Sequence, residues 1–199
     1  MSEEHRDDTA ARLGMWLFLF TEILLFGGLF VLYSVYEHDY PEAFSKGSRH
    51  LDLLLGTLNT AILLTGSFFV ASSLSAVRYG RRRLAVGLLW GGVVTGGIFL
   101  FNKYLEWSAE IGRGIYPGSP HLAQAEHGEA VFYSLYYVTL GLHGLHVLIG
   151  SIVLATMAVW VQIGKINSER FVALENGGLY WHLVDIVWIF IFPLYYLLL

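Results

Sequence analysis

Five long apolar runs in this 199-residue chain limit its fold more than any other feature of the sequence. A helix that crosses a bilayer needs about 20 consecutive apolar residues, and each run meets that length. The sequence therefore predicts an all-α integral membrane bundle of five transmembrane helices. The spans are expected at about Leu13–Tyr36, Leu53–Val77, Leu84–Trp107, Ala130–Gln162 and Leu174–Leu199.

The composition supports a membrane protein and narrows its chemistry. Hydrophobic residues make up 55% of the chain and charged residues only 14%, whereas soluble domains have about 25% charged residues. The sequence has no cysteine, which excludes disulfides, thiolate metal sites, iron–sulfur clusters and haem attached through cysteines. No basic run is long enough to indicate a nucleic-acid partner.

The distribution of lysine and arginine indicates how the helices are oriented. Cytoplasmic loops are enriched in these residues, and eight of them fall on the side of the N-terminus against four on the other side. We therefore expect the N-terminus inside and the C-terminus outside. Residues 1–12 are expected to form a polar cytoplasmic N-terminus, and residues 13–199 a single membrane domain with one long connecting loop at 108–129.

Glu22 is the ionisable residue of the first run. It lies about 13 Å along the expected helix, and no basic residue in that span can pair with it. Glu22 is therefore expected to be protonated or to meet a donor on another helix. Two roles remain open, namely a proton-relay or lipid-headgroup site and a structural tie between two helices.

His143 and His146 are three residues apart in the fourth run, so both lie on one side of that helix. Neutral imidazole binds iron, copper and zinc, which makes a metal or haem site one interpretation. The other is a pair of histidines that hydrogen-bond across helices. Gly144 between them would let a neighbouring helix approach closely.

The last run contains His182 and Asp185, which share one helical face with Trp188. An acid that faces lipid costs at least a few kcal/mol, so this face is expected to point toward protein. We expect a local hydrogen bond between His182 and Asp185. Counting along the spans places both at a level similar to Glu22 and His146, which predicts that these four residues meet.

Other polar residues lie closer to the outer ends of their spans. Asn59 in the second run and Glu106 in the third are expected to be structural, and Lys103, one turn before Glu106, is expected to pair with it. The third run also has Gly-x-x-x-Gly spacings, which are typical of close helix contacts, at Gly87, Gly91, Gly92, Gly96 and Gly97.

Taken in order, these segments resemble subunit III of the haem-copper terminal oxidases. The resemblance covers nearly the whole chain after Arg12, and its strongest segment lies in the fourth run. Many family members have seven helices, and this chain resembles the last five, a form known among bacterial oxidases. The resembling segments are Phe20–Phe26, Leu58–Thr60, Tyr104–Trp107, Tyr136–Gly150 and Tyr180–Trp188.

The resemblance implies a non-catalytic core subunit of aerobic respiration. Such a subunit supports subunit I, lipid binding and proton uptake while the complex reduces O2 to water with cytochrome c as donor. No cofactor or metal is expected on this chain; haems and copper are expected in partner subunits, and phospholipid is expected at residues that the sequence does not identify. The implied partners are oxidase subunits I and II, further subunits or a respiratory supercomplex, and lipids of a bacterial plasma membrane.

Several alternatives share the same sequence features. Within the same fold, the chain could serve a quinol oxidase, or a nitric oxide reductase as an accessory protein. A haem-b membrane cytochrome would use His143, His146 and His182 as ligands. A small proton transporter would use Glu22 and Asp185.

Overall fold

The computed structural model describes residues 3–197, with side chains from Asp8 onward, and each regular element in this range is a helix. Five of these helices are long and apolar enough to cross a membrane, which confirms the predicted all-α architecture. The helices are α1 (Glu3–Asp39), α2 (Pro41–His50), α3 (Leu53–Arg78), α4 (Arg82–Gly112), α5 (Pro120–Gln124), α6 (His127–Gln162) and α7 (Val172–Tyr196).

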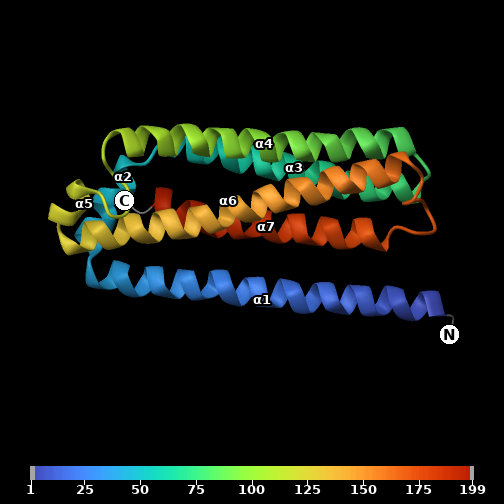
Figure 1. Ribbon diagram of the computed structural model, residues 1–199, viewed down its shortest axis with the longest axis horizontal. Helices are drawn as coiled ribbons and strands as arrows, with labels where there is room; N and C mark the ends of the chain where they lie inside the picture. Colours follow the sequence, from blue (N-terminus) through green and yellow to red (C-terminus); the bar gives the residue numbers. More distant parts are fainter. Residues whose placement is uncertain (1–2, 198–199) are drawn as a thin grey trace.

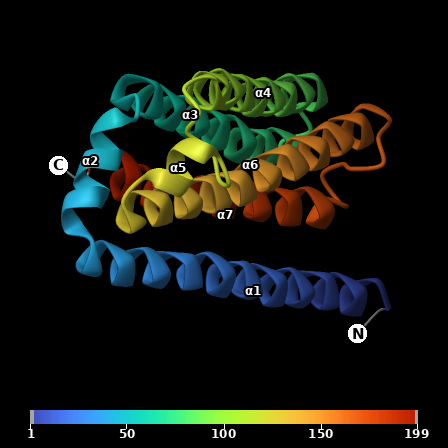
Figure 2. The same cartoon turned by 60° about the vertical axis from the view of Figure 1, so that its left-hand side comes forward.

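The long helices run side by side, and their connections lie at two ends of the molecule (Figure 1). Helices α3, α4, α6 and α7 pack together, whereas α1 lies along one side of α6 and α7 (Figures 1 and 2). The short helices α2 and α5 mark one end, which we call the α2–α5 end. The opposite end, called here the basic end, carries Arg78, Arg81, Arg82, Arg83, Lys165 and Arg170.

The helices extend beyond the apolar runs. Helix α1 already begins at Glu3, within the segment expected as a polar N-terminus, and the last two residues of the final expected span lie outside the described range. The segment 108–129, expected as a loop, contains the end of α4, all of α5 and the start of α6. Polar residues at a span's end can continue its helix, because only the central turns need to be apolar.

Helix α2 was not predicted. It begins with Pro41 at its first turn, where the missing N–H is not needed. Its buried residues Phe44, Gly47 and Ser48 recur every three to four positions and face the bundle. The Ser48 hydroxyl donates to the Tyr195 carbonyl oxygen over 2.8 Å, so α2 is fixed to the end of α7.

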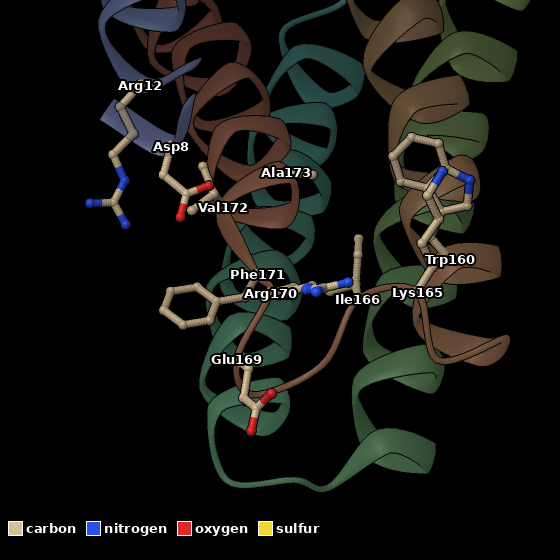
Figure 3. Close-up of a pocket in the computed structure, with 10 residues that line it drawn as sticks. All are labelled: Asp8, Arg12, Trp160, Lys165, Ile166, Glu169, Arg170, Phe171, Val172 and Ala173. Carbon is tan, nitrogen blue, oxygen red and sulfur yellow. The ribbon is translucent and has the colours of Figure 1, made fainter. Parts of the chain in front are cut away.

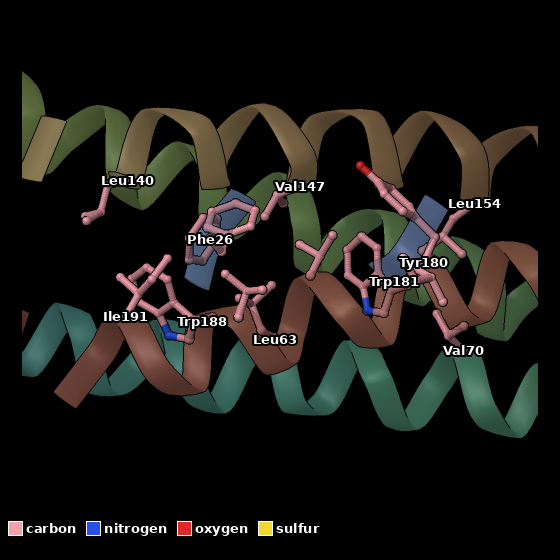
Figure 4. Close-up of a cluster of buried hydrophobic side chains, with 14 of the residues drawn as sticks. Phe26, Leu63, Val70, Leu140, Val147, Leu154, Tyr180, Trp181, Trp188 and Ile191 are labelled. Atoms are coloured by element: carbon pink, nitrogen blue, oxygen red, sulfur yellow. The ribbon is translucent and has the colours of Figure 1, made fainter. Parts of the chain in front are cut away.

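Trp181 lies in the centre of the four-helix core and is only 1% exposed (Figure 4). Three glycines from three helices surround its ring. A Cβ atom would lie 3.4 Å from the ring at Gly66 of α3, 2.9 Å at Gly96 of α4 and 3.1 Å at Gly150 of α6. These glycines therefore make room for the indole ring of Trp181.

The close-contact face predicted on α4 is confirmed for part of its glycines. Gly91, Gly92 and Gly96 lie against side chains of neighbouring helices. A Cβ atom at Gly87 or Gly97 would have nothing within 4 Å, so these two glycines line the outside of the bundle. Of the two Gly-x-x-x-Gly spacings, Gly92–Gly96 therefore lies wholly within the helix contacts, whereas Gly87–Gly91 lies within them only at Gly91.

Helix α1 attaches to the bundle by a narrow stripe. Its buried apolar side chains are Leu19, Phe26 and Tyr33, which are seven residues apart and therefore share one face. At the α2–α5 end, the Tyr33 hydroxyl donates to the Leu194 carbonyl oxygen over 2.5 Å. At the basic end, Arg12 of α1 pairs with Glu175 of α7 at 2.9 Å.

Candidate functional site

Glu22 and His146 connect α1 to α6. The Glu22 Oε2 and His146 Nε2 atoms are 2.9 Å apart, and the side chains are 13% and 11% exposed. The other ring nitrogen, Nδ1, lies 2.7 Å from the Leu142 carbonyl oxygen. Because a carbonyl oxygen can only accept, Nδ1 carries a hydrogen and donates it. The hydrogen bond between Nε2 and the Glu22 carboxyl group therefore needs one further proton. With this proton on the carboxyl group both side chains are neutral, and with it on Nε2 they form an ion pair.

Lys103 and Glu106 form the predicted ion pair in the part of the core nearer the α2–α5 end. The Lys103 Nζ atom lies 2.9 Å from Glu106 Oε2, and both side chains are buried. The hydroxyls of Tyr136 on α6 and Tyr196 on α7 donate to Glu106 Oε1 over 2.5 and 2.6 Å. Lys103 also donates to the Tyr196 hydroxyl over 2.6 Å. The four side chains therefore join α4, α6 and α7.

His143 is one helical turn from His146, but aromatic rings surround it. The ring centres of Trp188, Phe99 and Phe26 lie 5.3, 5.4 and 6.5 Å from the centre of the imidazole. Neither ring nitrogen has a hydrogen-bond partner among the described residues. Across the described side chains, no group of three or more His, Asp or Glu residues is arranged to hold a metal ion.

His182 and Asp185 do not form the expected local hydrogen bond. The Nδ1 atom of His182 lies 2.6 Å from the Ser67 hydroxyl of α3. The Asp185 Oδ1 atom is buried and has no hydrogen-bond partner among the described residues. The four residues expected to meet therefore do not form one group, because Glu22 and His146 join α1 to α6 whereas His182 contacts Ser67 on α3.

Asn59 lies at a further contact between helices. Its Oδ1 atom accepts a hydrogen bond of 2.8 Å from Asn102 Nδ2 on α4. The neighbouring Thr60 hydroxyl accepts one of 2.9 Å from Trp188 Nε1 on α7. Sequence reasoning missed the partners Ser67, Asn102, Tyr136 and Tyr196. A buried Lys–Glu pair needs additional hydrogen-bond donors. The tyrosines near the ends of the fourth and fifth apolar runs were therefore the sequence feature from which these partners could have been predicted.

A cavity of about 590 Å³ opens at the basic end, beside the N-terminal part of α1 and the segment that joins α6 to α7 (Figure 3). The Lys165 Nζ atom lies 3.9 Å from the centre of the Trp160 ring at this cavity. The charged residues that line it are of both signs: Arg12, Lys165, Arg170, Asp8 and Glu169.

Comparison with known proteins identifies the family. The family model described as cytochrome c oxidase subunit III matches residues 7–198. A cytochrome c oxidase subunit 3 of Thermostichus vulcanus is 31% identical over 99% of this chain and 90% of the relative. A haem-copper oxidase subunit I+III of Aeropyrum pernix is 32% identical over 94% of this chain, which spans only 22% of that relative. A probable quinol oxidase subunit 3 of Staphylococcus saprophyticus is 27% identical over 94% of this chain and 88% of the relative.

The family match extends over all five membrane-spanning helices and over both pairs of buried ionisable residues, Glu22–His146 and Lys103–Glu106. The chain therefore belongs to the cytochrome c oxidase subunit III family and serves as subunit III of a haem-copper oxidase.

Proposed function

We propose that this subunit supports its complex without carrying a redox centre. Haems and copper reside in subunits I and II, cytochrome c is the electron donor, and the complex reduces O2 to water in a bacterial plasma membrane. The N-terminus lies inside and the C-terminus outside, and residues 13–199 act as one membrane domain. The name of the Aeropyrum pernix relative, which joins subunits I and III in one chain, supports a position directly beside subunit I.

The observation that carries this proposal is that the carboxyl groups of Glu22 and Glu106 find hydrogen-bond partners on neighbouring helices. Glu22 on α1 meets His146 on α6 at 2.9 Å, and Glu106 accepts hydrogen bonds from a lysine and two tyrosines. Groups arranged in this way hold helices together, which is the work of a supporting subunit. Because α1 buries few apolar side chains, the contact between Glu22 and His146 is one of a small number that attach this helix to the bundle.

The proposed mechanism acts through the position of α1. The Glu22–His146 contact holds the middle of α1, while Arg12 and Tyr33 hold its two ends. A fixed α1 keeps the membrane surface and lipids beside subunit I in place, and with them the proton entrance of that subunit. Loss of the tie would then shorten sustained turnover before it changes the redox centres.

A substitution series at Glu22 in the whole complex tests this function. In Glu22→Leu, we expect the haem content per subunit I and the initial rate of O2 consumption to stay near wild type, and activity to decay several-fold faster during turnover. Glu22→Gln, which can still hydrogen-bond His146, should lose activity at a rate between those of the wild type and Glu22→Leu. Thr21→Val is the matched control, because the exposed Thr21 hydroxyl bonds only to Phe18 of its own helix.

Two outcomes would contradict the proposal. Loss of haem incorporation in Glu22→Leu would place Glu22 in cofactor assembly, and decay no faster than in Thr21→Val would remove its role in holding α1. Copurification with a tagged chain tests the subunit role itself, since the proposal requires a haem-copper subunit among the proteins recovered.

A quinol oxidase is the second candidate, favoured by the similarity to the Staphylococcus saprophyticus relative. Rates of the copurified complex with reduced cytochrome c and with a quinol separate the two donors. Reduction of nitric oxide in place of O2 would instead indicate an accessory protein of a nitric oxide reductase.

We also propose that the cavity at the basic end holds a phospholipid headgroup. Lys165 and Arg170 can attract the phosphate, while Asp8 and Glu169 can attract an amine, and Trp160 is suited to the membrane interface. Lipid analysis of the purified complex tests this, with less phospholipid retained in Lys165→Glu and an unchanged amount in Arg49→Glu at the opposite end.

A further inference from the structure

Two buried polar atoms on α7 lack a hydrogen-bond partner among the described residues. They are the indole nitrogen Nε1 of Trp181 and the carboxyl oxygen Oδ1 of Asp185, and these residues are only 1% and 5% exposed. Nearly all buried polar atoms in native proteins are hydrogen-bonded, either to protein or to ordered water. A donor and an acceptor one turn apart on the same helix therefore point to one shared partner.

Both atoms lie on the side of α7 that faces α3. The edge of the Trp181 ring that contains Nε1 and Cζ2 lies against Gly66 of α3, where a Cβ atom would be 3.4 Å from Cζ2. Figure 4 shows the indole nitrogen on the side of the ring away from α6. Further along α7, Trp188 Nε1 donates to the Thr60 hydroxyl of α3 over 2.9 Å. Asp185 lies between these two contacts on the same helical face, since it is one turn from each tryptophan.

The two atoms suit a water molecule in both spacing and chemistry. Side chains four residues apart on a helix have Cβ atoms about 5–6 Å apart, and two hydrogen bonds of about 2.8 Å through one water cover that distance. An indole nitrogen can only donate, and a carboxylate oxygen can only accept. Water accepts from the first and donates to the second. A metal cation could not accept the indole hydrogen, and an anion would be repelled by the carboxylate.

The Thr95 hydroxyl of α4 provides an acceptor for the second hydrogen of the water. Thr95 Oγ1 would contact a Cβ atom at Gly66, so it lies beside the same edge of the Trp181 ring. Its own hydrogen goes to the Gly92 carbonyl oxygen over 2.8 Å, and its lone pairs can accept a further bond. The water then makes three hydrogen bonds, the number typical of buried water.

We propose that one ordered water molecule is bound among α3, α4 and α7, where it accepts the Trp181 Nε1 hydrogen and donates to Asp185 Oδ1 and Thr95 Oγ1. This water is part of the core, and it joins α7 to α4 through hydrogen bonds that the side chains do not make directly. It also gives Asp185 a donor at a depth where an unpaired acid is costly. Glu22 and Glu106, in contrast, have their donors on side chains of the bundle.

A cryo-EM map of the whole complex, at a resolution that shows ordered waters, tests the site. We expect one density peak about 2.7–3.2 Å from both Trp181 Nε1 and Asp185 Oδ1. Trp188 is the matched control in the same map, because its Nε1 already donates to Thr60 and should have no such peak. The proposal would be overturned if the map showed other buried waters but none at Trp181, or if Trp181 bonded Asp185 directly.

Substitutions that preserve side-chain shape test which groups hold the water. Asp185→Leu removes an acceptor and should abolish the peak, whereas Asp185→Asn keeps an oxygen acceptor and should retain it. Thr95→Val should lower the peak height several-fold. Thr65→Val is its control and should leave the peak unchanged, since the exposed Thr65 hydroxyl bonds to Ala61 of its own helix. A peak of unchanged height in Asp185→Leu or in Thr95→Val would refute the assigned hydrogen bonds, and the second variant decides if the first does not assemble.

Discussion

Removal of the Lys103 charge is expected to destabilise this subunit more than removal of any surface charge. Lys103 and Glu106 are 8% and 4% exposed, and their charged atoms lie 2.9 Å apart. Lys103→Met leaves the Glu106 carboxylate buried with only the two tyrosine hydroxyls as donors. Breaking a buried ion pair in this way costs about 3–5 kcal/mol, which corresponds to a fall in unfolding temperature on the order of 10 °C for a chain of this size.

Two variants complete this experiment. Lys46 and Glu129 also pair, at 3.0 Å, but their side chains are 62% and 16% exposed, so Lys46→Met should cost about 0–1 kcal/mol. The double variant Lys103→Met with Glu106→Gln removes both charges and should be more stable than Lys103→Met alone, because no uncompensated charge remains.

The measurement is the loss of this subunit from the soluble purified complex after heating to a series of temperatures. The reasoning would be refuted if Lys103→Met behaved like Lys46→Met, because the pair would then be as well solvated as a surface pair. The reasoning would also be contradicted if the double variant lost more stability than Lys103→Met and Glu106→Gln lose in sum.

Two further predictions use the same heating assay and hydrogen exchange. Gly96→Ala should destabilise the bundle by about 1–3 kcal/mol, because its Cβ would lie 2.9 Å from the Trp181 ring, whereas Gly97→Ala should have little effect, since nothing lies within 4 Å. Equal effects would show that the core can repack around Trp181. Tyr33→Phe should cost about 1 kcal/mol by removing the bond to the Leu194 carbonyl, and should speed amide exchange near that end of α1; unchanged exchange would contradict this role.

The five-helix architecture could be predicted because the length of an apolar run is a local property of the sequence. The ion pair of Lys103 and Glu106 was predictable for the same reason, since the two residues are one turn apart on one helix. Helix α2 was missed because its ten residues carry few apolar side chains. Its stability comes from contacts such as that of Ser48 with Tyr195, which are distant in sequence.

The partners of the buried polar residues could be predicted less well. Counting residues along each span gives depth, but it does not give the direction in which a side chain points around the helix axis. Glu22 and His146 do meet, yet His182 at a comparable expected depth turns toward Ser67. The rotation of α7 is determined by the packing of large side chains such as Trp181, which no single-helix pattern reports.

The glycines around Trp181 have a consequence for movement along the membrane normal. A shift of one helical turn is about 5.4 Å, and it would bring the residue four positions further along each helix to the ring. In place of Gly66, Gly96 and Gly150, the ring would then meet Val70, Leu100 and Leu154. A shift the other way would bring Ile62 of α3 or His146 of α6 to the ring, so axial sliding of these two helices is sterically blocked in both directions. Helix α4 is blocked in one direction only, because Gly92 lies four positions before Gly96. Movement within this subunit is therefore expected as tilting of the less tightly held α1 or as a one-way shift of α4, and not as sliding of α3 or α6.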